Sequence, residues 1–141
     1  MNTLQIETLD PIKLPLVARL YKAHYPSGKA KKDELTIVGY HQSQIIALVR
    51  LRNVEQYRLL TGMLVVPDYR QHGFGHQLMA FCQQQVLKVG DYCFAYQHLE
   101  GFYAQHGFQT TDWMTLPNNL KPLFERYSRT KSLVAMQYIE M

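Results

Sequence analysis

The chain has 141 residues, of which 47% are hydrophobic and 18% charged, which is typical of one compact domain. Fifteen Lys and Arg against eleven Asp and Glu give a formal net charge of +4, a small excess that suits an anionic partner. These values exclude a repeat array and a disordered tail. The longest strictly apolar run, residues 45–49, is far shorter than the about 20 residues that span a bilayer. We therefore expect a single domain over residues 1–141 and no membrane partner.

The start of the chain and its cysteines predict a cytoplasmic protein. Glu7 and Asp10, followed by prolines, interrupt the apolar stretch that a secretory signal needs. Cys82 and Cys93 stand among apolar neighbours without C-x-x-C spacing, which favours buried, reduced thiols over a disulfide. The histidines show no ligand spacing with a third ligand in view, so we expect no metal.

The first half of the chain reads as a strand, a helix and three further strands. Alternation predicts a strand over residues 3–8, and Asp10-Pro11 predicts the start of an amphipathic helix that ends near residues 25–28. The buried face of that helix would hold Ile12, Leu16, Val17, Leu20 and Tyr21. Three consecutive strands follow over residues 35–40, 45–51 and 57–66, with turns at residues 41–44 and near Asn53. The short connections predict an antiparallel meander.

The second half alternates helices and strands. A strong helix follows the glycine-bearing loop after Pro67, with Leu78, Cys82, Val86 and Val89 on its buried face and Gly90 as its stop. The remaining predicted elements are a strand over residues 92–96, a short helix over 98–106, a strand from Phe108, a helix over 118–132 and a strand over 133–139. Pro122 fits the last helix only in its first turn. The pattern predicts an α+β fold with a mixed, mostly antiparallel central sheet of six to seven strands flanked by helices.

The segment from Met63 to Met79 points to an anion site. It reads as a strand, a turn, a loop with Gly73 and Gly75, and the start of a helix. Such a loop presents backbone N–H groups and the positive end of a helix dipole at one point, which suits a phosphate. Two glycines could also serve a tight turn alone. A dinucleotide fingerprint is excluded because residue 78 is leucine, and a P-loop because no Lys-Ser or Lys-Thr pair follows the second glycine.

This segment closely resembles the coenzyme motif of the GNAT superfamily of N-acetyltransferases. Residues 70–75, Arg-Gln-His-Gly-Phe-Gly, match that motif at every defined position, and they follow a strand that ends in Val-Pro-Asp-Tyr. The resemblance implies that backbone amides of residues 71–76 hold the pyrophosphate of acetyl-CoA and that the strand pairs with its pantetheine arm. The coenzyme-binding residues implied are Met63, Leu64, Val65, Arg70, Gln71, His72, Gly73, Phe74, Gly75 and His76.

A second block of the same family pattern occurs further along the chain. Residues 102–108 have an aromatic residue followed, after a short spacer, by Gly107 and Phe108. In many members the tyrosine at the position of Tyr103 protonates the departing CoA thiolate, since a thioester attacked by an amine expels a sulfur anion. Packing alone is the alternative role for Tyr103. For a general base the candidates by chain position are Glu55, Asp91 and His98, each of which could instead be a surface or capping residue.

The resemblance predicts an enzyme that moves the acetyl group of acetyl-CoA to a primary amine by direct attack in a ternary complex. The acceptor would be a small amine, a peptide N-terminus or a lysine, in a cleft between residues 21–32 and 110–116. Tyr25, Asp112 and Trp113 are the candidate wall residues. A homodimer is a further option.

Two alternatives are a non-catalytic acyl-CoA-binding regulatory module of the same fold and a basic nucleic-acid-binding domain. The second is disfavoured because the one dense basic patch, at residues 29–32, is followed at once by two acids.

Overall fold

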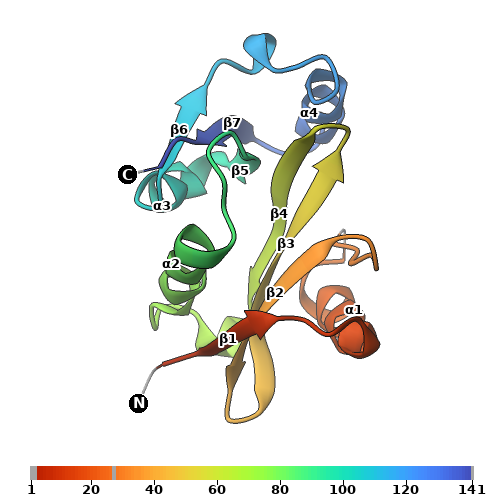
Figure 1. Ribbon diagram of the computed structural model, residues 1–141, viewed down its shortest axis with the longest axis vertical. Helices are drawn as coiled ribbons and strands as arrows, with labels where there is room; N and C mark the ends of the chain where they lie inside the picture. The colour runs from red at the N-terminus through yellow and green to blue at the C-terminus, as the bar shows by residue number, and fades with distance from the viewer. Residues whose placement is uncertain (1–2, 27, 141) are drawn as a thin grey trace.

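The computed structural model describes residues 3–26 and 28–140, which form one mixed sheet with helices on both faces (Figure 1). The strands are β1 (Gln5–Thr8), β2 (Leu35–His41), β3 (Gln44–Val54), β4 (Tyr57–Val65), β5 (Tyr92–Tyr96), β6 (Phe108–Thr111) and β7 (Leu133–Tyr138). The helices are α1 (Leu14–His24), α2 (Phe74–Gln85), α3 (Glu100–Ala104) and α4 (Lys121–Ser128). The strand order is β1-β2-β3-β4-β5-β7-β6, and among the described strands only the β4–β5 pair is parallel. The predicted fold class is confirmed.

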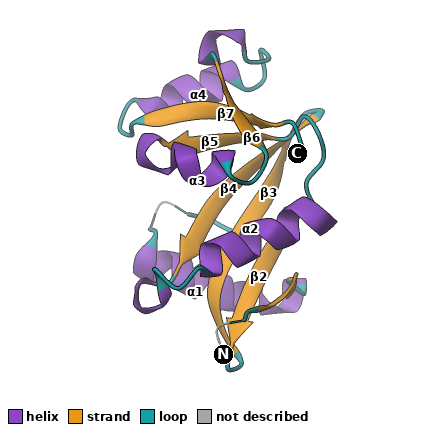
Figure 2. Cartoon of the chain, turned by 90° about the vertical axis from the view of Figure 1, so that its left-hand side faces the viewer, coloured by secondary structure: helices purple, strands orange, loops and turns teal. Residues whose placement is uncertain are grey.

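The helices divide between the two faces of the sheet (Figure 2). Neighbouring residues of β2 show the division, because Ile37 packs in the core beneath α2 whereas Val38 packs against α1. A third cluster of buried side chains joins α4 to β5 and β7 through Phe124. No helix of the described residues is long and apolar enough to cross a bilayer.

The first helix differs in phase from the sequence prediction. A short 3-10 turn, Pro11–Lys13, precedes α1, and the Asp10 side chain accepts a hydrogen bond from the Ile12 N–H at 3.1 Å. Because the tighter turn changes the rotation per residue, Ile12 is 80% exposed and Leu16 is 44% exposed. Their predicted burial is wrong. Val17 and Tyr21 are the buried residues of α1.

The helix after the glycine loop ends earlier than predicted. It stops at Gln85, and Val89 is 66% exposed, so the placement of Val89 on the buried face is wrong. The chain leaves the helix because the N–H groups of Val86 and Leu87 both bond the Cys82 carbonyl. Gly90, at φ +102°, takes up a left-handed turn before β5 and does not end the helix itself.

Two other connections also shift. The β3–β4 turn lies at Glu55 and Gln56, two residues beyond the predicted turn near Asn53, because both strands continue their pairing to Val54 and Tyr57. The predicted helix over residues 118–132 is shorter, since α4 covers Lys121–Ser128. Pro122 lies in its first turn, as the sequence requires.

The parallel pair β4–β5 is the irregular part of the sheet. It consists of two residue pairs, Leu59–Tyr92 and Leu60–Cys93, after which the strands separate. Strand β4 also carries a bulge, because its register against β3 shifts between Leu48 and Arg50, opposite Gly62. Gly62 has φ +68°, a conformation that favours glycine. The separation and the bulge together open the middle of the sheet.

Candidate active site

Two cavities meet where β4 and β5 separate. The larger has a volume of about 970 Å³ and lies on the side of α2 and α3, and the smaller, of about 310 Å³, lies on the side of α1 and α4. The residues that line both are Tyr25, Leu60, Thr61, Phe94 and Tyr96. A molecule in the larger cavity could therefore present one end to a molecule in the smaller.

The glycine loop forms one end of the larger cavity. Gly73 occupies the N-cap position of α2 with φ +80°, and the first intrahelical bond joins the Gln77 N–H to the Gly73 carbonyl at 3.0 Å. The N–H groups of Phe74, Gly75 and His76 precede that bond, so they have no partner within the helix. With the positive end of the helix dipole, they form a site suited to an anion such as a phosphate.

The two glycines of the loop serve different purposes. A Cβ at Gly73 would meet no atom within 4 Å, so that glycine is required by its positive φ alone. At Gly75 a Cβ would lie 3.4 Å from the ring of Phe102. A larger side chain at Gly75 would therefore press on α3 and cover the loop's N–H groups.

Most of the residues predicted to bind coenzyme are gathered around this cavity. Its lining includes Met63, Leu64, Val65, Arg70, Gln71, Gly73, Phe74, Gly75 and His76. His72 is the exception, because it is exposed, does not line the cavity and places its ring 6.0 Å from that of Phe74. The Arg70 guanidinium donates a hydrogen bond to the Val65 carbonyl at 2.8 Å, which ties the loop to the end of β4.

A buried chain of polar groups fixes the bulge in β4. The Glu34 carboxylate lies 2.6 Å from the Arg50 guanidinium, which donates to the Tyr21 hydroxyl at 3.1 Å. The Tyr21 hydroxyl in turn donates to the Gly62 carbonyl at 2.6 Å. Burial raises the pKa of Tyr21, so its hydroxyl stays protonated and remains a donor. Arg50 also donates to the Lys29 carbonyl, which anchors the loop between α1 and β2.

Tyr103 lies in the wall of the larger cavity and is 5% exposed. Its ring contacts Phe102 edge-on at 5.1 Å and Phe108 at 5.9 Å. Burial, with smaller effects from Cys93 and Tyr25, raises its pKa well above the usual value of 10.0. At neutral pH the phenol is therefore protonated and can act as an acid.

A pair of histidines links α2 to the turn between α3 and β6. His76 Nδ1 lies 2.9 Å from His106 Nε2, and His106 Nδ1 lies 2.7 Å from the Gln83 side-chain oxygen. Because that oxygen can only accept, His106 donates from Nδ1. Burial lowers the pKa of His106 below 6.5, and the neighbouring His76 lowers it further by a smaller amount. The ring is therefore neutral at pH 7.

The three candidates for a general base lie in different places. Asp91 pairs with Arg58 at 2.5 Å and accepts from the Lys88 N–H, so it holds the turn before β5. Glu55 is exposed in the β3–β4 turn with φ +54°. Of the three only His98 lines the larger cavity, where its ring lies 5.7 Å from that of Tyr96.

The smaller cavity has a different far wall from the one predicted. Asp112 accepts from the Met114 N–H at the start of a 3-10 turn, and Trp113 stacks on Phe124. Neither lines the cavity, so their assignment to its wall is wrong. The wall comes instead from Tyr127 of α4 and from residues that lead into β7.

The residues that sequence reasoning missed carry most of the charge in this cavity. Arg50 and Arg52 lie two positions apart at the end of the apolar run of strand β3, so they share the face that α1 and α4 cover. Two arginines at this spacing in such a strand were a signal in the sequence. No comparable pattern marks Tyr96 or Tyr127, which reach the site only through the sheet order.

Comparisons with known proteins agree with this geometry. A sequence profile described as an acetyltransferase (GNAT) domain matches residues 32–110, which is more than half of the chain. A comparison with curated protein sequences gives no match. The chain therefore belongs to the GNAT family of acetyltransferases. The family implied by the resemblance is thereby confirmed.

Solved structures share the fold at low identity. N-acetylglutamate synthase from Neisseria gonorrhoeae, complexed with coenzyme A and N-acetyl-glutamate, matches with a TM-score of 0.73 and 14% identity over 98% of this chain and 36% of its own. This chain thus spans about a third of that enzyme's length. The ribosomal-protein-S18-alanine N-acetyltransferase from Escherichia coli matches with a TM-score of 0.67 and 14% identity over 99% and 96% of the two chains. PaiA N-acetyltransferase from Thermoplasma acidophilum, in complex with coenzyme A, matches with a TM-score of 0.64 and 13% identity. The match covers 97% of this chain and 99% of that protein's chain.

Proposed function

We propose that the chain binds acetyl-CoA in the larger cavity and transfers its acetyl group directly to a primary amine in the smaller one. The observation that carries this proposal is the meeting of the two cavities at the point where β4 and β5 separate. Leu60 and Thr61 from one strand and Phe94 and Tyr96 from the other line both cavities. A thioester placed between them would face the acceptor without an intermediate carrier.

The proposed coenzyme pose uses the backbone more than the side chains. The pyrophosphate would accept hydrogen bonds from the N–H groups that precede the first intrahelical bond of α2. The edge of β4 from Thr61 to Val65 faces β5 without pairing to it. The amides of the pantetheine arm would pair, as an added strand does, with backbone groups of this edge other than the Gly62 and Val65 carbonyls, which already accept from Tyr21 and Arg70.

The proposed reaction is attack of a neutral amine on the thioester carbonyl. The C–N bond forms, the C–S bond breaks, the sulfur leaves as a thiolate, and the amine nitrogen loses a proton to solvent. Tyr103 would donate its proton to the thiolate, because it is protonated at neutral pH and lies in the wall of the cavity that would hold the coenzyme, and a proton from solvent would then restore the phenol. His98 lines the same cavity and is the remaining base candidate.

The test is an acetylation screen over amino acids, polyamines, aminoglycosides and N-terminal peptides. Release of the CoA thiol would be followed together with the mass of the product, so that hydrolysis of acetyl-CoA is distinguished from transfer. The proposal expects acetylated product in equal amount to the released thiol. A regulatory module would bind acetyl-CoA without turnover by any amine, and a nucleic-acid-binding domain would show salt-sensitive binding of nucleic acid and none of acetyl-CoA.

A further inference from the structure

The smaller cavity has a strongly unbalanced charge. Of the fifteen Lys and Arg in the chain, five line this cavity, against one of the eleven Asp and Glu. The cationic residues are Lys29, Lys31, Arg50, Arg52 and Lys131, and the carboxylate is Glu34. The small positive excess of the whole chain is therefore concentrated at one site.

The carboxylate does not balance the other cations, because Arg50 already neutralises it. Glu34 and Arg50 lie 2.6 Å apart with side chains only 4% and 8% exposed. Within residues 3–26 and 28–140, neither of the two ion pairs includes Arg52 or Lys131. These two cations therefore face the cavity with uncompensated charge.

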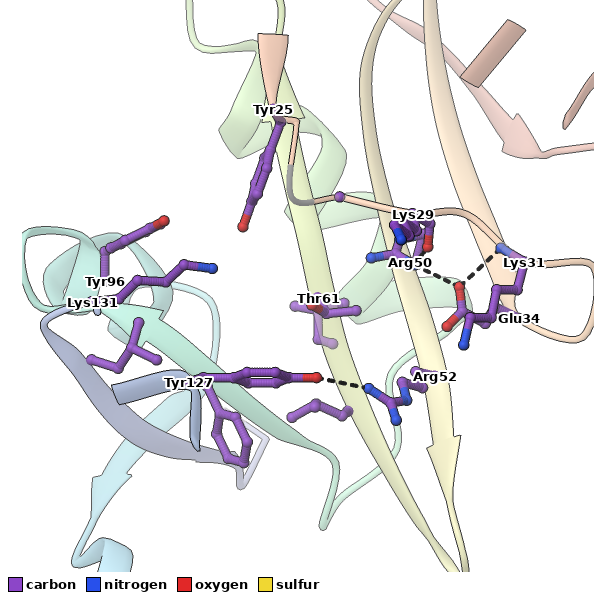
Figure 3. Close-up of a pocket in the computed structure, with 15 residues that line it drawn as sticks. Tyr25, Lys29, Lys31, Glu34, Arg50, Arg52, Thr61, Tyr96, Tyr127 and Lys131 are labelled. Atoms are coloured by element: carbon purple, nitrogen blue, oxygen red, sulfur yellow. Dashed lines mark hydrogen bonds and ion pairs between the residues drawn. The ribbon is translucent and has the colours of Figure 1, made fainter. Parts of the chain in front are cut away.

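Arg52 is held in position for a ligand. It is half-buried, and its guanidinium donates a hydrogen bond to the Tyr127 hydroxyl at 3.0 Å (Figure 3). A guanidinium has five N–H donors, so this bond orients the group and leaves donors for a carboxylate or a phosphate. Lys131, also half-buried, enters the same cavity from the segment between α4 and β7.

The tyrosines of the shared wall lie on the same side of this cavity as Lys131, apart from Arg52 (Figure 3). Tyr25 and Tyr96 line both cavities and point their hydroxyl groups into the space that Lys131 also enters (Figure 3). A cavity of about 310 Å³ is at the lower end of the range for small-molecule sites. It can hold a molecule the size of an amino acid, with its amine toward the thioester.

We infer that the acceptor is a small primary amine that also carries an anionic group, a carboxylate or a phosphate, which Arg52 binds and which the positive charge of Lys131 attracts. This inference rests on the proposed function. The same cations repel a protonated amine and so favour the neutral amine that can attack the thioester. Polyamines and other multiply charged cations would meet like charge in a half-buried site and are disfavoured as acceptors.

The experiment compares amines that differ only in the anionic group. Glycine is paired with glycinamide and glutamate with its diamide, 2-aminoethyl phosphate represents the phosphate class, and spermidine is the cationic control. Thiol release at saturating acetyl-CoA gives kcat/KM for each amine. We expect the best anionic amine to exceed its amide partner and spermidine at least roughly tenfold. The amino acid and phosphate arms show which anion is bound.

Variants test the two residues directly. Arg52→Gln and Lys131→Gln should each raise KM for the anionic amine about tenfold with a smaller change in kcat, because they remove binding of a group remote from the reacting atoms. Arg19→Gln and Lys88→Gln change exposed cations that do not line the cavity, and they should leave KM unchanged.

The outcomes separate this inference from the proposed function. If the amides or spermidine are acetylated as well as the anionic amines, the inference is overturned and the transferase function stands. If no amine is acetylated, the function fails, and calorimetry with glutamate and 2-aminoethyl phosphate in the presence of CoA decides the inference. Binding that Arg52→Gln weakens would support an anion site, and absence of binding would overturn it.

Discussion

Leu60 of β4 pairs with Cys93 of β5, and this is the last pair before the two parallel strands separate. The next residues along the two strands, Thr61 and Phe94, line both cavities. A continuous sheet would keep molecules on its two faces apart, since every backbone group within it is paired. The early end of this ladder therefore creates the passage on which the proposed transfer depends.

Replacing Tyr103 by Phe should lower kcat by about 10²-fold or more, the usual range for loss of a general acid. Acetyl-CoA affinity should change little, because the ring and its packing are retained. Steady-state kinetics and calorimetry with CoA measure the two effects. Tyr138→Phe is the matched control, since it removes a hydroxyl from a buried ring that lines neither cavity. Unchanged turnover in Tyr103→Phe would remove this residue from the chemistry.

Replacing Arg50 by Met should destabilise the fold by about 3–5 kcal/mol, the usual cost of leaving a buried charge without its partner. Glu34, 4% exposed at its side chain, would lose its ion pair, and the Tyr21 hydroxyl would lose a donor. Urea unfolding measures the loss. The double variant Arg50→Met with Glu34→Gln should recover part of it, because no uncompensated carboxylate remains. A double variant as unstable as the single one would contradict the assigned role of the pair.

Stability should fall as the pH drops below about 6.5, the ordinary pKa of histidine. Burial, and next His76, lower the pKa of His106 in the folded protein, so the unfolded chain binds the proton more tightly between the two values. The free energy of unfolding therefore increases as the pH rises through this window and decreases as the pH falls through it. Melting curves at pH 5.5 and 7.5 test this. His106→Gln should reduce the difference, whereas His72→Gln, at an exposed ring, should not.

The two cysteines should not react with thiol reagents in the folded protein at pH 8. Burial raises the pKa of both Cys82 and Cys93 to about 12, so the reactive thiolate is scarce and also inaccessible. Titration with an aromatic disulfide should count no fast-reacting thiol in the native state and two after denaturation. A fast native reaction would show that one of them reaches solvent. Unreactive cysteines would also mean that the protein's own thiols add no signal to assays that detect the thiol of released CoA.

Local sequence signals were sufficient to place the glycine loop before α2 and Tyr103 on the short helix after β5. Gly73 is required by its positive φ, and the N–H groups without partners belong to the start of a helix. Both features depend on neighbouring residues only, so they could be predicted from the local sequence. The same holds for the alternation that defines β2, β3 and β4. These features are short-range, which is why the glycine loop and the meander were predicted with nearly correct bounds.

The acceptor side depends on long-range pairing that one sequence does not display. Strand β5 pairs in parallel with β4 across a helix, and Tyr127 reaches Arg52 over 75 residues. The resemblance places one side of the acceptor cleft at residues 110–116 and so predicts Trp113 in its wall, yet Trp113 stacks on Phe124 in a separate cluster of buried side chains. Periodicity alone also missed the phase change that a short 3-10 turn introduces before α1, which exposes Ile12.

The central claim, that the glycine loop and the cavity beside it hold acetyl-CoA, is tested most directly by thermal unfolding with and without the coenzyme. Acetyl-CoA at about 100 times its dissociation constant should stabilise the protein by about 2.7 kcal/mol through linkage, seen as a rise in Tm. Gly75→Val should remove the rise, because its side chain would press on Phe102 and cover the loop amides. Gly101→Val, exposed and open around its Cβ, should retain it. An unchanged Tm of the unaltered protein at millimolar acetyl-CoA would contradict the claim.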